Sequence, residues 1–375
     1  MRITGGLVFD PSGSFVKRDV TVSNGRFSDR EEQGLVIDAT DMYVVPGLID
    51  IHLHGCDGYD VCDATKEALH GMAAYELKCG ITSICPTTMT MGVDRLKEVV
   101  DNAGTFTSDD KESHIIGINM EGPFLSEEKM GAQNPAYLLR PDFGLFVDLL
   151  ECAKGRIVLC DIAPELPGAI DFIKEASKTC RVSLAHTMAD YDKSIEAFDA
   201  GADHVTHLYN GMMPYNHREP GLVGAASDRE DVFVELIADG IHVSPTVVRN
   251  TIKIFGEDRV VFISDSMRAC GLPDGESELG GQKVIKKGNR ATLEDGTIAG
   301  SVMNLMDIVR TAASSMNIPL EAAIKCATVN PAKSLGLYGE LGSIDIGKRA
   351  DLLILDRELQ LINVIKNGEI IIPGC

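Results

Sequence analysis

The chain has 375 residues, of which 44% are hydrophobic and 24% charged, and these are the proportions of a folded globular protein. A chain of this length is expected to fold as one large domain with a smaller one. Its formal net charge of −21 argues against nucleic acid or an anionic membrane as a partner, because both bind basic surfaces, and no apolar run approaches membrane-spanning length.

Cysteine usage bears on the cellular compartment. Ten cysteines are scattered along the chain without CxxC pairs, and the first residues, Met1 to Gly6, lack the apolar core of a secretion signal. We therefore expect reduced thiols in a cytoplasmic protein rather than a secreted disulfide framework.

Short strands and tight turns are predicted at both ends of the chain. Residues 1–47 contain several short apolar runs and the pair Asn24-Gly25, which is a strong hairpin signal. The segment 335–375 repeats this style, with runs at 350–356 and 361–365 and a second turn at Asn367-Gly368. Neither segment has enough strands for a core of its own, so the two are expected to form one small β-sandwich domain together.

Residues 48–334 have a different pattern, in which strand-like apolar runs recur and most are separated by helical patterns. Such alternation predicts a (β/α)8 TIM-like barrel, whose active site lies at the carboxyl ends of the strands. A doubly wound sheet is the alternative, but Gly55-Cys56-Asp57-Gly58 does not match the glycine-rich nucleotide loop that usually follows the first strand of such a sheet. The predicted strands are 47–54, 81–87, 115–121, 157–162, 182–186, 204–208, 232–238 and 260–265, and the predicted helices 64–79, 93–103, 167–178, 190–200 and 244–255.

The first of these strands carries the clearest chemical signal. Asp50, His52 and His54 alternate with apolar residues, so the two imidazoles point to one face of the strand. Two histidines side by side at a strand end that runs into Gly55 make half of a metal site.

Polar residues end most of the other predicted strands as well. Any one of them alone fits a structural role, but a whole set at consecutive strand ends points to a site. Imidazoles and carboxylates are ligands for Zn, Fe or Mn, and a metal held by them activates water and polarises a carbonyl. A carboxylate beside it exchanges the proton, so the sequence predicts metal-assisted hydrolysis. The residues are His52, His54, Thr87, Thr88, Glu121, His186, His207, Asp239, His242 and Asp265.

Several motifs together resemble a known family. The HxH at 52–54 and the stretch GKRAD at 347–351 are typical of the amidohydrolase superfamily. The segments EGPF at 121–124, HLYNGM at 207–212 and DGIH at 239–242 are more specific and resemble the N-acetylglucosamine-6-phosphate deacetylase family within it. The resemblance spans nearly the whole sequence.

The resemblance implies a metal centre and a catalytic acid/base. Glu121, His186 and His207 match the ligands of the family's principal metal, and His52 and His54 match a second-metal pair that only some members have. One or two divalent ions per chain are therefore expected, zinc foremost, with iron, manganese and cobalt as alternatives. Asp265 matches the catalytic acid/base.

The resemblance also implies the substrate and an assembly. The expected reaction is the hydrolysis of N-acetyl-D-glucosamine 6-phosphate to acetate and the amino sugar phosphate, in a homodimer in which Arg218 reaches across the interface. Gln133 stands where several members carry a histidine, and its amide donates a hydrogen bond but cannot carry a proton. The implied substrate-binding residues are Ala132, Gln133, Asn210, Gly211, Arg218, His242, Ile298, Ala299 and Gly300.

Three alternatives stay open at this point. In the first, the substrate is the galacto epimer. In the second, the same barrel acts on a cyclic amide or an aminated base. In the third, the barrel is a catalytically silent scaffold. The cyclic-amide class is disfavoured because its members often bridge two metals with a modified lysine, and here the bridging position falls on Glu121, with Lys129 after a loop. The scaffold is disfavoured because no expected ligand is missing. Near the site, His204 points opposite to His207 by strand period and is expected to be structural.

Overall fold

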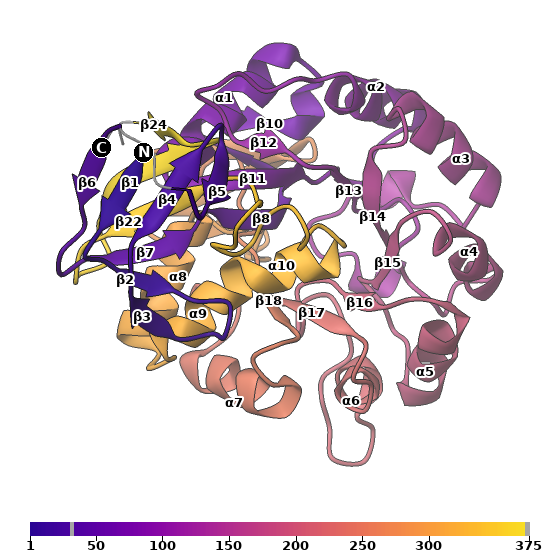
Figure 1. The fold of residues 1–375 in the computed structure, drawn as a ribbon. Helices are drawn as coiled ribbons and strands as arrows, with labels where there is room; N and C mark the ends of the chain where they lie inside the picture. The colour runs from indigo at the N-terminus through magenta and orange to yellow at the C-terminus, as the bar shows by residue number, and fades with distance from the viewer. Residues whose placement is uncertain (31–33, 372–375) are drawn as a thin grey trace.

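A barrel of parallel strands forms the centre of the computed structural model, which describes residues 1–30 and 34–371 (Figure 1). Two sheets make up the barrel, with strand orders β12-β11-β8 and β13-β14-β15-β16-β17-β18. A bridge between Thr87 and Asn119 joins them on one side, and on the other the Asp265 N–H donates to His52 O at 2.9 Å. The strands are β8 (Leu48–Leu53), β11 (Ile81–Pro86), β12 (His114–Ile115), β13 (Ile118–Met120), β14 (Ile157–Ile162), β15 (Arg181–Leu184), β16 (His204–Val205), β17 (Phe233–Leu236) and β18 (Val260–Phe262).

Helices surround the barrel, as Figure 1 shows. Those that cross over between strands carry an apolar face against the sheet; in α2, for example, Leu96, Val99 and Val100 are fully buried. The predicted (β/α)8 barrel is confirmed. The helices are α1 (Lys66–Lys78), α2 (Val93–Gly104), α3 (Phe143–Cys152), α4 (Ala169–Ala176), α5 (Tyr191–Ala200), α6 (Gly221–Ser227), α7 (Pro245–Phe255), α8 (Leu305–Ser315), α9 (Leu320–Ala327) and α10 (Val329–Ser334).

Several barrel strands end two or three residues before the predicted ends. β15 stops at Leu184, β16 at Val205 and β18 at Phe262. The reason is visible in the backbone just beyond, where His186, His207 and Asp265 have φ angles of 42°, 29° and 48°. These left-handed conformations cannot continue a strand and are uncommon outside glycine, and they cluster where side chains are held for a function.

Both chain ends contribute to a second, smaller β unit, which lies beside the barrel (Figure 1). Its two sheets have the orders β5-β4-β1-β6 and β24-β23-β22-β7-β2-β3. A separate core between them draws on both ends of the chain, for example Val20, Phe27, Leu352 and Ile365. The predicted turns at Asn24-Gly25 and Asn367-Gly368 have the positive φ angles of tight hairpins. The proposed division of the chain at residues 47 and 335 agrees with this arrangement and remains a prediction.

The strands of the small unit are short, as the sequence predicted. Their bounds are β1 (Arg2–Thr4), β2 (Leu7–Phe9), β3 (Phe15–Lys17), β4 (Val20–Ser23), β5 (Arg26–Ser28), β6 (Val36–Asp38), β7 (Tyr43–Pro46), β22 (Leu352–Leu355), β23 (Leu361–Lys366) and β24 (Glu369–Ile371).

A three-stranded antiparallel sheet that the sequence analysis did not predict follows the last barrel strand. It consists of β19 (Gly275–Leu279), β20 (Gln282–Lys287) and β21 (Arg290–Leu293). Its apolar side, with Leu279 and Val284, packs on Met89 and Met267, two residues that follow barrel strands. The Gln282 side chain also donates to Ala132 O at 2.6 Å. The sheet therefore covers one side of the barrel mouth. A small hairpin, β9 (Gly55–Cys56) and β10 (Tyr59–Asp60), follows β8.

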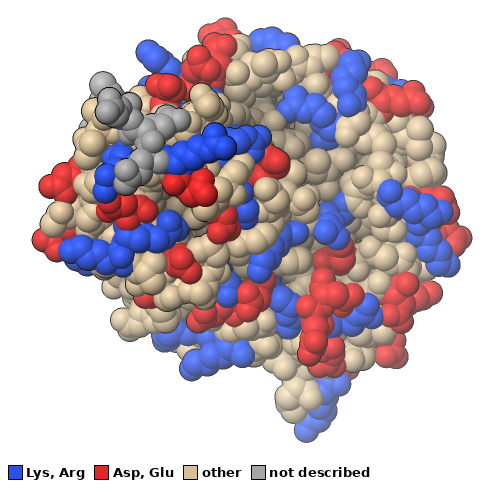
Figure 2. Space-filling model, in the orientation of Figure 1, with Lys and Arg blue, Asp and Glu red and all other residues tan. Residues whose placement is uncertain are grey.

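The distribution of surface charge and the state of the thiols complete the description of the fold. On the face seen in Figure 2, Lys and Arg side chains are interspersed with Asp and Glu side chains and form no continuous basic patch. None of the helices in the described ranges has the length and apolar character needed to span a membrane. The nine cysteines within those ranges are all free thiols.

Candidate active site

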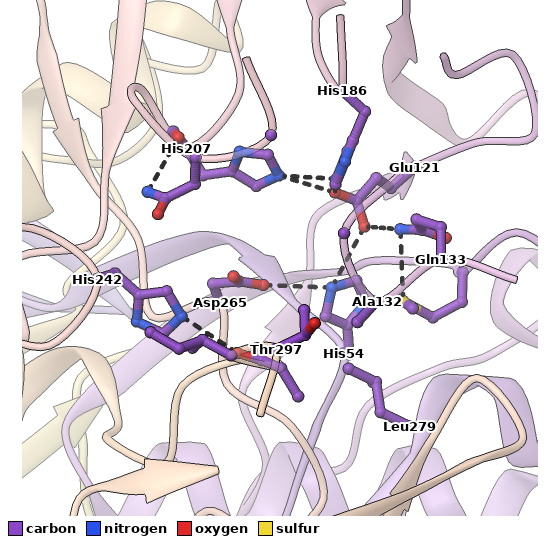
Figure 3. A pocket seen from close by; sticks show the side chains of 17 residues that line it. His54, Glu121, Ala132, Gln133, His186, His207, His242, Asp265, Leu279 and Thr297 are labelled. Carbon is purple, nitrogen blue, oxygen red and sulfur yellow. Dashed lines mark hydrogen bonds and ion pairs between the residues drawn. The ribbon is translucent and has the colours of Figure 1, made fainter. Parts of the chain in front are cut away.

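A pocket of about 220 Å³ opens at the carboxyl ends of the barrel strands. Residues from β8, β11, β13, β15, β16, β17 and β18, or from the loops that follow them, line it, and so does the sheet β19–β21. Figure 3 shows the imidazoles and carboxylates pointing into this space. The lining residues are His54, Met89, Glu121, Gly131, Ala132, Gln133, His186, His207, Asn210, Gly211, His242, Asp265, Leu279, Thr297, Ile298, Ala299 and Gly300.

Glu121, His186 and His207 converge on one point. Glu121 Oε1 lies 3.1 Å from the Nε2 atoms of both His186 and His207, and those two nitrogens are 3.1 Å apart. Their ligand atoms therefore lie close enough together to hold a metal ion. Three residues from three different strand ends meet because parallel barrel strands all end at the same mouth.

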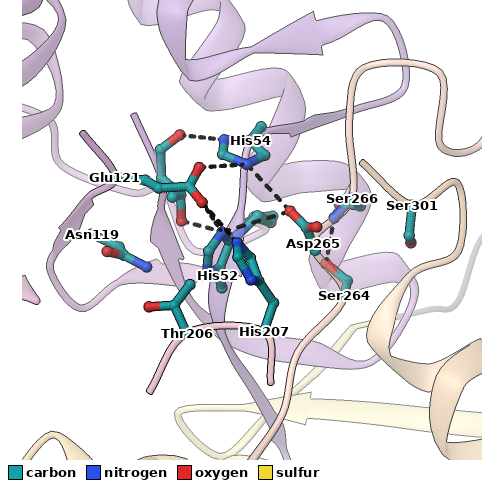
Figure 4. A network of polar contacts seen from close by, with 12 residues as sticks. His52, His54, Asn119, Glu121, Thr206, His207, Ser264, Asp265, Ser266 and Ser301 are labelled. Carbon is teal, nitrogen blue, oxygen red and sulfur yellow. Dashed lines mark hydrogen bonds and ion pairs between the residues drawn. The ribbon is translucent and has the colours of Figure 1, made fainter. Parts of the chain in front are cut away.

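His52, His54 and Asp265 form a second group beside the first (Figure 4). Asp265 Oδ1 lies 3.2 Å from His54 Nε2 and 3.6 Å from His52 Nε2. Glu121 joins the groups, because its Oε1 is 3.8 Å from His52 Nε2 and its Oε2 is 3.4 Å from His54 Nε2. One oxygen of this carboxylate thus faces His186, His207 and His52 and the other faces His54, an arrangement suited to one ion or to two.

The donor atoms fit a divalent metal ion. They are imidazole nitrogens and carboxylate oxygens, which bind Zn, Fe or Mn, and no thiol belongs to either group. His52 Nε2 is buried and has no hydrogen-bond partner among the described residues, although it points at Asp265 and Glu121. A buried nitrogen without a partner costs free energy, and a bound cation would satisfy it.

Hydrogen bonds on the far side of two of the imidazoles fix their orientation. His54 Nδ1 lies 2.9 Å from Thr87 O, and His186 Nδ1 lies 2.7 Å from Lys129 O. Because a carbonyl oxygen only accepts, each Nδ1 carries a proton, and each Nε2 is the nitrogen left to bind a cation in the pocket. These are the tautomers that metal ligands need.

Both carboxylates of the centre are ionised. Burial alone would raise the pKa of Glu121, but hydrogen bonds with His186 and His207 and the charge of His52 hold it well below its ordinary value. Burial likewise works against Asp265, yet the contact with His54 and the nearby imidazoles lower its pKa overall. Asp265 lines the pocket as a carboxylate, so it is ready to accept a proton there.

Gln133 is held directly beside the centre. Its Nε2 donates to Glu121 Oε2 at 2.7 Å, and its Oε1 accepts the Thr90 N–H at 2.7 Å. The side chain is 3% exposed and lines the pocket, so the amide group has little freedom to turn. The glutamine therefore presents a fixed, uncharged donor where several members of the family that this sequence resembles carry a histidine.

His242 and the loop at residues 297–300 form the side of the pocket opposite to Gln133 (Figure 3). His242 Nδ1 lies 2.7 Å from Asp239 Oδ2, and His242 Nε2 lies 3.1 Å from Ala299 O. Burial lowers the pKa of His242, but the hydrogen bond with Asp239 and the charges of Asp239 and Asp265 outweigh it and raise the pKa overall. The ring is therefore suited to receive an anionic group.

The structure brings most of the predicted site residues together. His52 lies beneath the pocket rather than on its wall, and it is fully buried. Arg218 lies outside the pocket; it is exposed and lines a separate groove of about 590 Å³ with Tyr191, Met213 and Glu219. The loop that carries it projects from the body beside α6 in Figure 1. Within one chain, then, Arg218 does not reach the pocket.

Four lining residues were not predicted. Met89 follows the Thr87-Thr88 pair, and the strand-end rule could have been extended by one residue to include it. Gly131 adjoins the predicted pair Ala132 and Gln133. Leu279 and Thr297 come from or follow the sheet β19–β21, which no strong periodicity in the sequence announced.

Comparisons with known proteins agree with this geometry. The pattern of the amidohydrolase family matches residues 43–371. The chain is 36% identical over 335 residues to the N-acetylglucosamine-6-phosphate deacetylase of Bacillus subtilis, covering 88% of this chain and 85% of that protein. It is 32% identical over 327 residues to an N-acetylgalactosamine-6-phosphate deacetylase of Escherichia coli, covering 87% of this chain and 86% of that one.

Solved structures show the same fold. A mutant of N-acetyl-D-glucosamine-6-phosphate deacetylase from Mycobacterium smegmatis, in complex with N-acetyl-D-glucosamine-6-phosphate, superposes with a TM-score of 0.93 at 31% identity, over 99% of both chains. The N-acetylglucosamine-6-phosphate deacetylase of Thermotoga maritima gives a TM-score of 0.87 at 27% identity, also over 99% of both chains.

Proposed function

This chain belongs to the amidohydrolase family, and from that premise we propose that it hydrolyses the acetamide of N-acetyl-D-glucosamine 6-phosphate, releasing acetate and D-glucosamine 6-phosphate. The observation that carries the proposal is the convergence of Glu121, His186 and His207 at the mouth of the barrel, next to Asp265. The enzyme is a metal-dependent amide hydrolase. The scaffold alternative is disfavoured because both ligand groups are complete.

Glu121, His186 and His207 are proposed to hold the principal ion, and His52 and His54, with Asp265, a second one. We propose zinc as the native metal, since imidazole and carboxylate ligands suit it, with iron, manganese or cobalt as substitutes. When bound, the cation lowers the pKa of water and polarises the acetyl carbonyl.

Asp265 is the proposed acid/base. Its carboxylate takes a proton from the water that attacks the acetyl carbon, and the same proton then passes to the sugar nitrogen as the C–N bond breaks. One water is consumed for one amide bond, and its second proton leaves the new carboxyl group, so that the products are acetate and the protonated amine. The lowered pKa of Asp265 suits the first step, because the group is a carboxylate when the substrate arrives.

Gln133 is proposed to lie against the acetyl group. One N–H of its Nε2 donates to Glu121 Oε2, and the other, which lies only against Met89 Sδ, can donate to a carbonyl oxygen, but the amide has no proton to give away. Proton transfer thus rests on Asp265 alone in this chain.

The phosphate is proposed to bind at the other end of the pocket. His242 offers a cationic ring and Asn210 and Gly211 offer amide groups, while Ile298, Ala299 and Gly300 cover the sugar. Arg218 is proposed to come from a second copy of the chain in a homodimer. This is supported by its exposure, its place on a projecting loop, and the neighbouring Tyr215, which is 55% exposed.

A cytoplasmic location is proposed because the nine described cysteines are free thiols and because sugar phosphates are made and used inside cells. The galacto epimer is the second candidate substrate, favoured by the similarity to a deacetylase of that substrate.

The test is acetate release from a panel of N-acetyl sugars, both epimers, each with and without the 6-phosphate. We expect turnover of the phosphorylated gluco sugar to exceed that of every other member. Asp265→Asn should keep the ion held by Glu121, His186 and His207 and lower kcat by about a thousandfold or more. No acetate from any phosphorylated sugar, or near-normal turnover in Asp265→Asn, would refute the proposal.

A further inference from the structure

Glu235 is a buried carboxylate for which the proposed chemistry has no use. It lies in the middle of β17, an otherwise apolar barrel strand (Phe233–Leu236), and is 0% exposed. Its carboxylate is therefore shielded from solvent by the surrounding barrel. A charge inside a barrel needs compensating contacts to be tolerated.

Those contacts lead to the metal centre. Glu235 Oε2 lies 3.0 Å from His52 Nδ1, and it also accepts the backbone N–H of His207 at 3.2 Å. The Glu235 carbonyl oxygen accepts the N–H of Leu208 at 2.8 Å. One residue therefore contacts the side chain of one proposed ligand and the backbone of another, and these two ligands belong to different groups.

The contact with His52 determines how that imidazole faces the centre. A carboxylate only accepts, so Nδ1 carries a proton and Nε2 is the nitrogen left to bind a cation. Nε2 is buried without a hydrogen-bond partner in the described chain and faces Asp265 Oδ1 and Glu121 Oε1. With a proton on Nε2, the ring would direct an N–H at two carboxylates and could not bind a cation.

The contact with His207 acts on the backbone. His207 has a φ of 29°, a conformation that costs free energy in a residue with a side chain. Glu235 accepts two hydrogen bonds, one from each of the His207 and Leu208 N–H groups, and they hold this turn in place directly after β16.

A second histidine backs the carboxylate. His204 Nε2 lies 3.3 Å from Glu235 Oε1, and His204 Nδ1 lies 2.9 Å from Ser334 Oγ on α10. A line of polar groups thus runs from the outer helix through the barrel wall to the centre. His204 was expected to be structural, and its position behind Glu235 indicates that its role is to support that carboxylate.

Glu235 differs from the other supports of the ligands. His54 and His186 face the carbonyl oxygens of Thr87 and Lys129, whereas His52 faces the carboxylate of Glu235. A charged acceptor makes an imidazole a stronger ligand than a neutral one does. The difference concerns His52, and therefore the proposed ion at His52 and His54, a pair that only some members of the family have.

We propose that Glu235 is a positioning residue of the metal centre, which orients His52 as a ligand, steadies the turn at His207, and thereby sets the affinity of the ion held by His52 and His54. The inference rests on the proposed metal centre and goes beyond the proposed activity, because it concerns ion binding and not the identity of the substrate.

The test compares metal binding in the full-length protein with that of three variants. Glu235→Gln keeps the size and an acceptor oxygen but removes the charge, and Glu235→Leu removes both. Glu76→Gln is the control: Glu76 is also 0% exposed, it contacts none of the proposed ligands, and burial raises its pKa to about 8, so its charge is already absent at neutral pH. Zn²⁺ is the probe, the number of ions per chain and their dissociation constants are measured by chelator competition, and circular dichroism verifies folding.

We expect Glu235→Gln to weaken binding of the ion at His52 and His54 about 10-fold and Glu235→Leu to weaken it about 100-fold. Glu76→Gln should leave that affinity unchanged. The ion at Glu121, His186 and His207 should be affected less. Equal affinities in wild type and folded Glu235→Gln, or an equal loss in Glu76→Gln, would overturn the proposal. If wild type released no acetate yet its Zn²⁺ affinity depended on Glu235, the proposed activity would fail and this inference would stand.

Discussion

Replacing Asp239 by asparagine tests how the phosphate end of the pocket works. Asp239 Oδ2 lies 2.7 Å from His242 Nδ1, while its Oδ1 accepts the backbone N–H groups of Ile241 and His242 at 2.8 Å each. His242 Nε2 lies 3.1 Å from Ala299 O. Because oxygen acceptors face both ring nitrogens, His242 is held as a cation. In Asp239→Asn, the side-chain oxygen would still accept the two backbone N–H groups, so the amide N–H would face His242 Nδ1. The ring could then no longer carry a proton on Nδ1.

The size of the effect follows from the loss of that charge. A hydrogen bond to a charged group contributes about 1.5–3 kcal/mol, and the His242 side chain is only 8% exposed, so solvent screens the contact little. A neutral imidazole would therefore lose an interaction free energy of the same order with the phosphate. About 1.4 kcal/mol is a factor of ten in affinity, so Asp239→Asn should raise KM about 10-fold or more with a smaller change in kcat.

The pH dependence has a definite sign. Asp239 raises the pKa of His242 above the ordinary 6.5, in spite of burial, which lowers it. The cation, and with it the affinity for the phosphate, is therefore complete below pH 6.5 and is lost as pH rises through the raised pKa. KM should rise toward alkaline pH in the wild type, and in Asp239→Asn this rise should begin at lower pH.

Acetate release measured between about pH 6 and 9 gives both quantities, since the phosphate is largely a dianion over that range. An unphosphorylated N-acetyl sugar is the control and should show little change. An unaltered KM for the phosphorylated sugar in Asp239→Asn, or an equal rise for the unphosphorylated one, would refute this account of His242.

Other consequences are open to simple measurement. Arg218→Ala should raise KM for the phosphorylated sugar only, and mixing it with an inactive Asp265→Asn chain should restore some activity if Arg218 acts across a dimer; no restoration would deny the shared site. Gln133→Ala removes the 2.7 Å hydrogen bond to Glu121 and should lower kcat about tenfold, and a normal kcat would separate Gln133 from catalysis. Phe146→Ala empties a fully buried position beside Phe172 and should cost about 3–5 kcal/mol in the free energy of unfolding without changing KM, as denaturant titration would check.

Much of the fold could be predicted because the signals are local. The alternation of apolar runs with helical patterns gave the barrel, and Asn24-Gly25 and Asn367-Gly368 gave two hairpins in which both residues have positive φ angles. The strand ends were less accurate. Composition does not reveal that His186, His207 and Asp265 leave the strand direction, because the left-handed conformation is imposed by the surrounding contacts rather than by local preference.

The convergence of side chains followed from topology. Once parallel strands are placed in a barrel, residues after their carboxyl ends must meet, which is why the sequence predicts that distant residues such as Glu121 and His207 lie together. The epimer preferred, the number of ions and the dimer do not follow from this rule. They depend on distances of a few tenths of an ångström or on a second copy of the chain.

What could not be predicted depends on contacts between segments far apart in sequence. Leu279 reaches the pocket only because the sheet β19–β21 packs on Met89 and Met267. Glu235 had one available signal, a carboxylate in the interior of an apolar strand, which is costly unless it is paired. Its pairing with His52, 183 positions away, required the structure.

The central claim is that Glu121, His186 and His207 share a divalent ion. Crystals of the protein grown with Zn²⁺, measured on both sides of the zinc absorption edge, locate that ion by its anomalous scattering. The account predicts the strongest peak among Glu121 Oε1, His186 Nε2 and His207 Nε2, where these atoms lie 3.1 Å from one another. A fully loaded crystal with no peak at that point would contradict it.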